Sequence, residues 1–182
     1  PAHCGIYTPY GFKVEEYWKL KSEPHTENVE ETAEHLRNLL GDAVKRQLVS
    51  DVPVGTFLSG GLDSSAISAF TAEEFKKHGK ILDTYSIDYE DNSKYFKANE
   101  FQPNSDSEWA IKMHEFIGSN HHGIVNSNKD LADALVDAVK ANDLPGMADI
   151  DSSFYLFCKA VRKEKTVTLS GECADEIFGG YP

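Results

Sequence analysis

The sequence predicts an α/β fold with an open parallel sheet and helices on both faces, preceded by a short β-hairpin. Three observations support this prediction. A short apolar run at 54–58 passes through Ser59-Gly60-Gly61 into helical spacing that begins at Leu62. A strand–helix–strand succession follows, and such a βαβ unit makes neighbouring strands parallel. The strand–Ser–Gly pattern then returns at 167–171.

The first 24 residues differ from the rest of the chain. Two β-prone runs, 3–8 and 12–18, flank the turn Pro9-Tyr10-Gly11. Because a lone hairpin is only marginally stable in water, we expect residues 1–24 to be the C-terminal remnant of a preceding domain plus a linker. Residues 25–182 then form a second domain.

Hydrophobic periodicity assigns the elements of the second domain. The helix at 27–49 is amphipathic, with glutamates near its start and Lys45 and Arg46 near its end, as the helix dipole favours. We predict strands at 54–58, 81–89, 121–125 and 167–169, further helices at 62–78, 107–116, 128–141 and 152–162, and loops at 91–106 and 143–149.

Composition narrows the classes of function. A net charge of −12 over 182 residues leaves no basic stripe to neutralise phosphates, which argues against a nucleic-acid partner. No apolar run approaches the length of a membrane span. The cysteines Cys4, Cys158 and Cys173 form no CxxC motif, so we expect reduced thiols in a cytoplasmic protein.

The loop after the first strand has the composition of a phosphate-binding site. Its adjacent glycines permit positive φ and close approach of the backbone, and the following helix start supplies unpaired N–H groups. It matches neither GxxxxGK[ST] nor GxGxxG. Asp63 is unusual there, because a carboxylate beside phosphates is repulsive unless a cation lies between them. The loop therefore predicts bound Mg²⁺.

The second Ser–Gly loop adds further acids. Parallel strands end at one edge of a sheet, so both loops are expected to face one nucleotide at that edge. Glu172 and Asp175 follow Ser170-Gly171 directly, and several carboxylates around a polyphosphate again indicate Mg²⁺.

These two motifs carry a family resemblance. SGGLDSS at 59–65 resembles the PP-loop of ATP pyrophosphatases, which cleave ATP between the α and β phosphates. With SGECADEIFGGYP at 170–182 and the lead-in DVPVG at 51–55, the chain resembles the synthetase domain of glutamine-dependent asparagine synthetases. The resemblance implies an adenine nucleotide α hydrolase-like fold, and residues 1–24 resemble the end of the family's glutaminase domain. It also implies that the ATP-binding synthetase domain at 25–182 is truncated at its C-terminus and continues beyond this sequence.

The resemblance also implies roles for individual residues. Leu58 and Ile87 would contact the adenine or ribose of ATP, and Ser170 and Gly171 would approach the nucleotide through their backbones. Asp63 and Asp175 would bind Mg²⁺, and Glu172, with Asp63, would be catalytic. The pyrophosphate would be held by Ser59, Gly60, Gly61, Leu62, Asp63, Ser64 and Ser65.

The implied reaction is ATP-dependent asparagine synthesis. Aspartate would be activated as β-aspartyl-AMP with release of pyrophosphate, and ammonia would then displace AMP. The ammonia would come from glutamine through an N-terminal glutaminase domain that lies outside this sequence. The resemblance leaves a homodimer open.

Two departures keep alternatives open. Cys173 stands where the family's second motif has glycine, and Leu144 replaces an acid in a loop near the acid substrate. One alternative is a PP-loop amide or β-lactam synthetase paralogue that adenylates another carboxylate. A second alternative is a non-catalytic ATP-binding fragment, although simple binding does not require Glu172. Asp149 either lies near the acid substrate or caps the next helix.

His121 and His122 also invite a metal-site interpretation. Adjacent residues on a strand point to opposite faces of the sheet. We therefore expect that these two side chains do not share a metal ion.

Overall fold

The computed structural model describes residues 2–97 and 105–180. Part of the predicted loop at 91–106, and Tyr181-Pro182 of the second motif, lie outside these residues. The chain divides into two units, 1–37 and 38–182, with the division inside helix α1 (Val29–Gln47). Each unit is described by itself.

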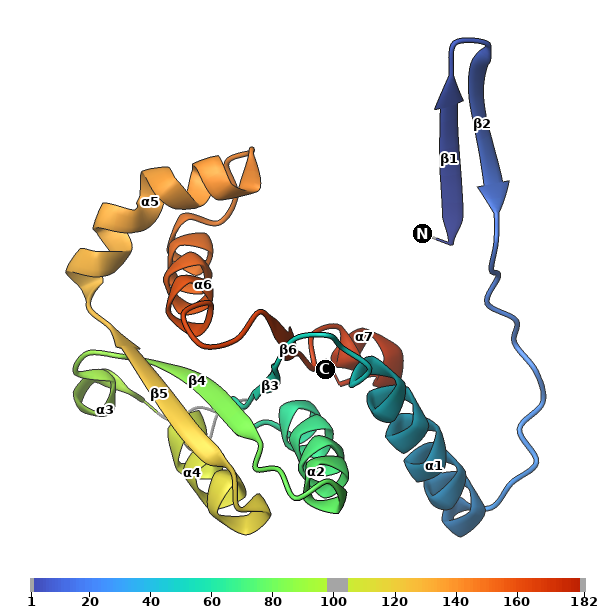
Figure 1. Ribbon diagram of the computed structural model, residues 1–182, viewed down its shortest axis with the longest axis horizontal. Coiled ribbons are helices and arrows are strands. Elements are labelled where there is room, and N and C mark those ends of the chain that lie inside the picture. Colours follow the sequence, from blue (N-terminus) through green and yellow to red (C-terminus); the bar gives the residue numbers. More distant parts are fainter. Residues whose placement is uncertain (1, 98–104, 181–182) are drawn as a thin grey trace. The chain divides into compact units, whose positions relative to one another are not determined.

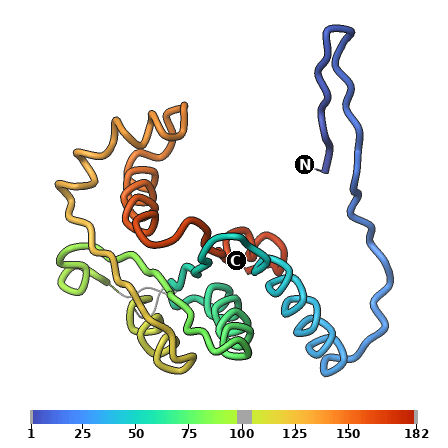
Figure 2. The backbone as a smooth tube through the Cα atoms, viewed as in Figure 1, coloured from blue at the N-terminus to red at the C-terminus, as the bar shows by residue number. Residues whose placement is uncertain are grey.

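The first unit contains the predicted hairpin. Strands β1 (His3–Thr8) and β2 (Gly11–Glu16) form an antiparallel hairpin (Figure 2). Their register places Tyr7 opposite Phe12. Every residue of both strands is exposed within the structure. Helix α1 begins with a reciprocal cap, because Glu31 N–H donates to Asn28 Oδ1 at 2.9 Å and Asn28 N–H donates to Glu31 Oε2 at 3.1 Å.

The second unit is organised around a parallel sheet. Its strands β3 (Val54–Phe57), β4 (Asp83–Tyr89), β5 (Asn120–Asn126) and β6 (Val167–Leu169) lie in the order β5-β4-β3-β6 (Figure 1). The chain runs outward from β3 through β4 to β5 and then returns to the other side of β3. The strand order therefore reverses between β3 and β6, which is where open α/β sheets bind ligands.

Helices cover both faces of this sheet, as predicted. On one face lie α2 (Leu62–Lys77) and α4 (Asp106–Ile117), and Thr56 Oγ1 lies 2.8 Å from Ser68 Oγ of α2 (Figure 1). On the other face, Phe157 and Val161 of α6 (Ala148–Val161) pack against Tyr85. Helix α5 (Asn128–Asn142) packs on α6. None of the described helices is long and apolar enough to cross a membrane.

The structure corrects three predictions of local structure. The predicted loop at 91–106 contains a short helix, α3 (Asn92–Tyr95). Helix α6 begins at Ala148, four positions before the predicted start. Its N-cap residue is Met147 without a side-chain cap, so the interpretation of Asp149 as the N-cap is wrong. Asp149 lies in the first turn, where the helix dipole favours an acid.

The two adjacent histidines point to opposite faces, as predicted. His121 Nδ1 lies 2.9 Å from Thr84 Oγ1, on the face covered by α4, and its ring stacks on His114. His122 Nε2 lies 3.2 Å from Asp83 Oδ1 on the other face. Burial lowers the pKa of His121, which keeps it neutral within this packing.

An ionic clamp, formed by Asp83, Tyr85, Glu164 and Lys165, holds the segment that leads into β6. Lys165 Nζ lies 2.5 Å from Asp83 Oδ2, and Tyr85 Oη donates to Glu164 Oε2 at 3.0 Å. These side chains cross β3 at Gly55, where an added Cβ would lie 3.0 Å from Tyr85 Cε2 and 3.5 Å from Lys165 Cγ. Because Gly55 has no side chain, Tyr85 and Asp83 of β4 can contact Glu164 and Lys165, which precede β6, across β3.

Lys165→Met should destabilise the protein by about 1–3 kcal/mol, because it leaves the partly buried Asp83 carboxylate without its cation. Burial raises the pKa of Asp83, but hydrogen bonds from Lys165, His122 and Asn120 outweigh it and lower that pKa overall. Ionised Asp83 therefore adds stability that is lost as pH falls through its lowered pKa. In Lys165→Met the folded-state pKa of Asp83 rises, so the part of the acid-induced loss of stability that comes from Asp83 should become smaller.

Urea unfolding across the acidic pH range measures both effects of this variant. Lys163→Met serves as the control, because Lys163 adjoins Glu164 in the sequence but is not part of the clamp. Equal unfolding free energies for Lys165→Met and wild type would show that the clamp contributes nothing.

Candidate functional site

The first site loop joins β3 to α2, and its two glycines serve different purposes. Gly60 has φ +96° and lies against the start of α4, where an added Cβ would meet Ala110 N at 2.7 Å and Trp109 Cβ at 2.9 Å. Gly61 is the N-cap of α2, and among the described residues an added Cβ would meet only Ser59 Oγ, at 3.5 Å. The open side of the loop is therefore at Gly61, while Gly60 lets the loop pack on α4.

Hydroxyl groups fix the shape of this loop. The Ser64 hydroxyl donates to Gly61 O at 3.1 Å and accepts from Ser59 N–H at 3.3 Å. Ser59 Oγ lies 3.0 Å from Ser64 Oγ and accepts from Gly61 N–H at 3.3 Å. Ser64 is buried, so its hydroxyl holds the loop closed around the start of α2.

The second site loop packs directly on the first. An added Cβ on Gly171 would lie 3.0 Å from Asp63 Cβ and 3.1 Å from Ser64 N. The loop after β6 thus touches the first turn of α2, and Glu172 N–H donates to Ser170 Oγ at 3.2 Å within it. The structure brings the two predicted Ser–Gly loops together at the point where the strand order reverses.

Two adjoining cavities open at this edge of the sheet. The first, of about 330 Å³, has Leu58, Ile87 and Phe96 among its apolar walls. The second, of about 410 Å³, lies over both loops and is lined by Gly61, Asp63, Ser64, Ser170, Gly171, Glu172, Cys173 and Asp175. Ser59 and Ile87 line both cavities. An elongated ligand can therefore occupy both.

The acids of the second cavity suit Mg²⁺ chemistry. Among the described residues, no three His, Cys, Asp or Glu side chains are grouped to bind a metal ion. Mg²⁺ usually keeps several waters and takes one or two carboxylates together with substrate phosphates. Asp63 and Asp175, which both line the second cavity, fit that requirement.

Three predicted binding residues lie apart from both cavities. Leu62 is 85% exposed, and neither it nor Ser65 lines a cavity. Gly60 faces α4, as described above. Any contact these residues make with a nucleotide stays a prediction.

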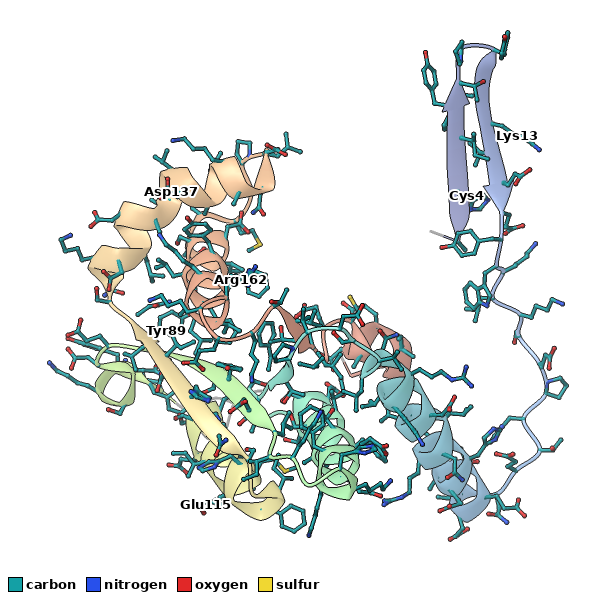
Figure 3. All side chains as sticks on the ribbon, in the orientation of Figure 1. Cys4, Lys13, Tyr89, Glu115, Asp137 and Arg162 are labelled. Carbon is teal, nitrogen blue, oxygen red and sulfur yellow. The ribbon has the colours of Figure 1, made fainter. Side chains whose placement is uncertain are left out.

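Helix α6 contributes a wall of the site that the sequence did not predict. Tyr89 at the carboxyl end of β4 lies on the side of α6, and its Oη is 2.7 Å from Ser153 Oγ (Figure 3). Ile150 and Phe154 of α6 line the second cavity, and the Phe57 and Phe154 rings meet edge to face, with centroids 6.3 Å apart. The apolar spacing of the helix beginning at 148 was the only available signal, and it is equally typical of a core-facing helix.

Cys173 adopts a backbone conformation that favours glycine. Its φ is +70° and its ψ is 10°, in the left-handed region where a side chain costs energy. It precedes α7 (Ala174–Phe178), which carries Asp175. This conformation gives a physical reason for glycine at this position in the motif it resembles.

Comparison with known proteins identifies the family. The asparagine synthase family model matches residues 35–182. The chain belongs to the asparagine synthase family. This asparagine synthase domain is 57% identical, over 100% of its length, to asparagine synthetase [glutamine-hydrolyzing] 3 of Bacillus subtilis. It is also 33% identical over 91% of its length to a putative asparagine synthetase [glutamine-hydrolyzing] 2 of Methanocaldococcus jannaschii. It spans 30% of the length of each of these relatives.

Solved structures give a more distant likeness to the asparagine synthase domain. An NAD⁺ synthetase from Burkholderia pseudomallei is similar with a TM-score of 0.45 and 14% identity, over 84% of this chain and 66% of that one.

Cys173→Gly should stabilise the protein by about 0.5–1 kcal/mol, because glycine adopts the left-handed conformation without strain. Chemical unfolding measures the change. Cys173→Ala removes the thiol but keeps the Cβ, so it should show no comparable gain. A gain as large in the alanine variant would place the effect in the thiol instead of the backbone.

Gly171→Ala should force the two loops apart, because its Cβ would lie within 3.1 Å of Asp63 Cβ and Ser64 N. We expect nucleotide affinity to fall by about tenfold or more, a loss comparable to that of one charged hydrogen bond. Gly123→Ala is the matched control, since no atom of residues 2–97 or 105–180 lies within 4 Å of its added Cβ. Calorimetric titration with ATP measures the affinity of each variant. An affinity of Gly171→Ala equal to that of wild type and of Gly123→Ala would contradict the expectation.

Proposed function

We propose that this protein performs ATP-dependent asparagine synthesis. The β-carboxylate of aspartate attacks the α-phosphorus of ATP, giving β-aspartyl-AMP and pyrophosphate. Ammonia then attacks the acyl carbon, and asparagine and AMP leave. Adenylation is needed because a free carboxylate has no good leaving group.

The contact between the two Ser–Gly loops is the observation that carries this proposal. It creates one continuous site from an apolar cavity beside Leu58 and Ile87 and an acidic cavity over the start of α2. A nucleotide with its adenosine in the first cavity and its phosphates in the second passes Ser59, which lines both. The free N–H groups at the start of α2 then face the phosphates.

The acids take separate parts in the proposed reaction. Asp63 and Asp175 would hold Mg²⁺, which when bound would offset the negative charge of the phosphates and the attacking carboxylate. Glu172, next to Gly171, is suited to accept a proton from the attacking ammonia. The N–H groups of the first α2 turn bind the leaving pyrophosphate.

The nitrogen source is a further part of the proposal. The two relatives above are described as glutamine-hydrolysing, and we extend glutamine-derived ammonia, a glutaminase partner domain, homodimerisation and a cytoplasmic location to this protein.

The second cavity favours one alternative substrate class. Its described lining contains Phe57, Ile150 and Phe154 but no lysine or arginine. A paralogue that adenylates a more apolar carboxylic acid, as in amide or β-lactam synthesis, suits such a wall.

Pyrophosphate release by the full-length protein tests both functions. The assay contains ATP, Mg²⁺ and one carboxylic acid at a time, with glutamine or ammonium as the nitrogen source. We expect aspartate-dependent release that yields asparagine. Release with an apolar acid but not with aspartate would favour the alternative, and no release with any acid would contradict both.

Asp63→Asn should lower pyrophosphate release by about a hundredfold or more, because one of the Mg²⁺-binding charges is lost. Asp42→Asn removes an exposed carboxylate of α1 and should leave the rate unchanged. A rate for Asp63→Asn close to wild type would remove Asp63 from the metal site.

A further inference from the structure

Asp88 lies beside the first cavity with a fixed side chain and an unused oxygen. It lines that cavity near the carboxyl end of β4. Its Oδ1 accepts hydrogen bonds from Asn92 Nδ2 at 2.7 Å and from Tyr89 N–H at 2.8 Å. Its Oδ2 makes no hydrogen bond with the described part of the chain. The carboxylate is therefore anchored through one oxygen, and the other is free to accept.

The anchor comes from α3, the short helix that the sequence did not predict. Asp91, at its N-cap, has φ +61°, which turns the chain back after β4 and brings Asn92 over Asp88. Tyr89 N–H donates to its neighbour Asp88 at the same turn. This turn orients one acid, and the orientation has no other evident use in the sheet.

The position of Asp88 in the sheet suits ribose recognition. Strand β4 is next to β3, whose end begins the phosphate loop. In dinucleotide-binding folds, an acid following the phosphate loop hydrogen-bonds a ribose hydroxyl, while the phosphates lie at the helix N-terminus. Asp88 has the corresponding place, because it lines the first cavity but not the second. It is thus set apart from the phosphate loop.

The chemistry of the cavity agrees with this position. A carboxylate only accepts hydrogen bonds, and the 2′- and 3′-hydroxyls of ribose both donate. Leu58 and Phe96 offer apolar surface for a base. A volume of about 330 Å³ lies within the range of small-molecule sites.

We propose that Asp88, held by Asn92, binds the ribose hydroxyls of the nucleotide and makes the site select ribonucleotides over deoxyribonucleotides. This inference rests on the proposed nucleotide site. It adds a specificity-determining residue that no Ser–Gly motif contains.

Calorimetric binding to the full-length protein in Mg²⁺ tests the proposal, with ATP, 2′-deoxyATP, 3′-deoxyATP and inosine triphosphate as ligands. Wild type should bind ATP about ten- to a hundredfold more tightly than at least one deoxynucleotide, because a charged hydrogen bond is lost. Asp88→Asn should lose this preference through weaker ATP binding. Asn92→Ala should weaken the preference for ATP, because it removes the side chain that orients Asp88 but leaves the carboxylate in place.

Asp91→Asn is the matched control, since it removes a neighbouring acid that lines neither cavity. Asparagine also tolerates the left-handed conformation there. This variant should keep the ribose preference, and thermal unfolding shows that all variants fold.

The remaining outcomes overturn the proposal in distinguishable ways. Equal affinity of wild type for ATP and both deoxynucleotides overturns it while pyrophosphate release still supports the proposed function. In another outcome, Asp88→Asn leaves the preference for ATP over the deoxynucleotides intact and abolishes only the preference for ATP over inosine triphosphate. That result would show that the carboxylate binds the adenine amine and not the ribose. Failure to bind any nucleotide overturns both proposals.

Discussion

The contact of Gly171 with the first turn of α2 is the constraint on which the site depends. An added Cβ at this position would lie 3.0 Å from Asp63 Cβ, so the two loops meet backbone to backbone. Strand β6 has only three residues and pairs only with β3 among the described strands. Without the contact, little would fix the loop that carries Glu172. Ligand atoms can approach both loops at once because no side chain separates them there.

The short strand β6 is therefore held at both ends. Before it, the ionic clamp ties Lys165 to Asp83 of β4 at 2.5 Å, passing over Gly55. After it, Gly171 packs on α2. Both attachments depend on a glycine whose missing side chain leaves room for a neighbouring residue. These glycines are Gly55 in β3 and Gly171 in the loop after β6. A change at the end of the sheet remote from the ligand can thus reach the site through the position of β6.

The sequence predicted the strands, the faces covered by helices and the meeting of the two loops, because each depends on local apolar runs and glycine breaks. It failed where tertiary contacts decide. Gly60 suggested room for a ligand, but its near neighbours are residues of α4. Helix α3 forms in a segment whose polar residues are also typical of exposed loops. The 2.7 Å contact of Tyr89 with Ser153 likewise joins two segments that lie far apart in the sequence. The start of α6 lacks a side-chain cap, so no capping signal marked it.

The two cavities suggest why the proposed adenylation and the proposed amide formation would share one site. In the proposed reaction Ser59 lies where adenosine and phosphates meet, and Gly171 and Glu172 face the phosphate side. Pyrophosphate can leave from the open end at Gly61 while the adenylate stays anchored by its nucleoside. Ribose recognition by Asp88 would strengthen that anchor on the nucleoside side of the reacting phosphorus. Binding energy from the nucleoside would then hold the acyl group in place for ammonia, which itself offers few contacts.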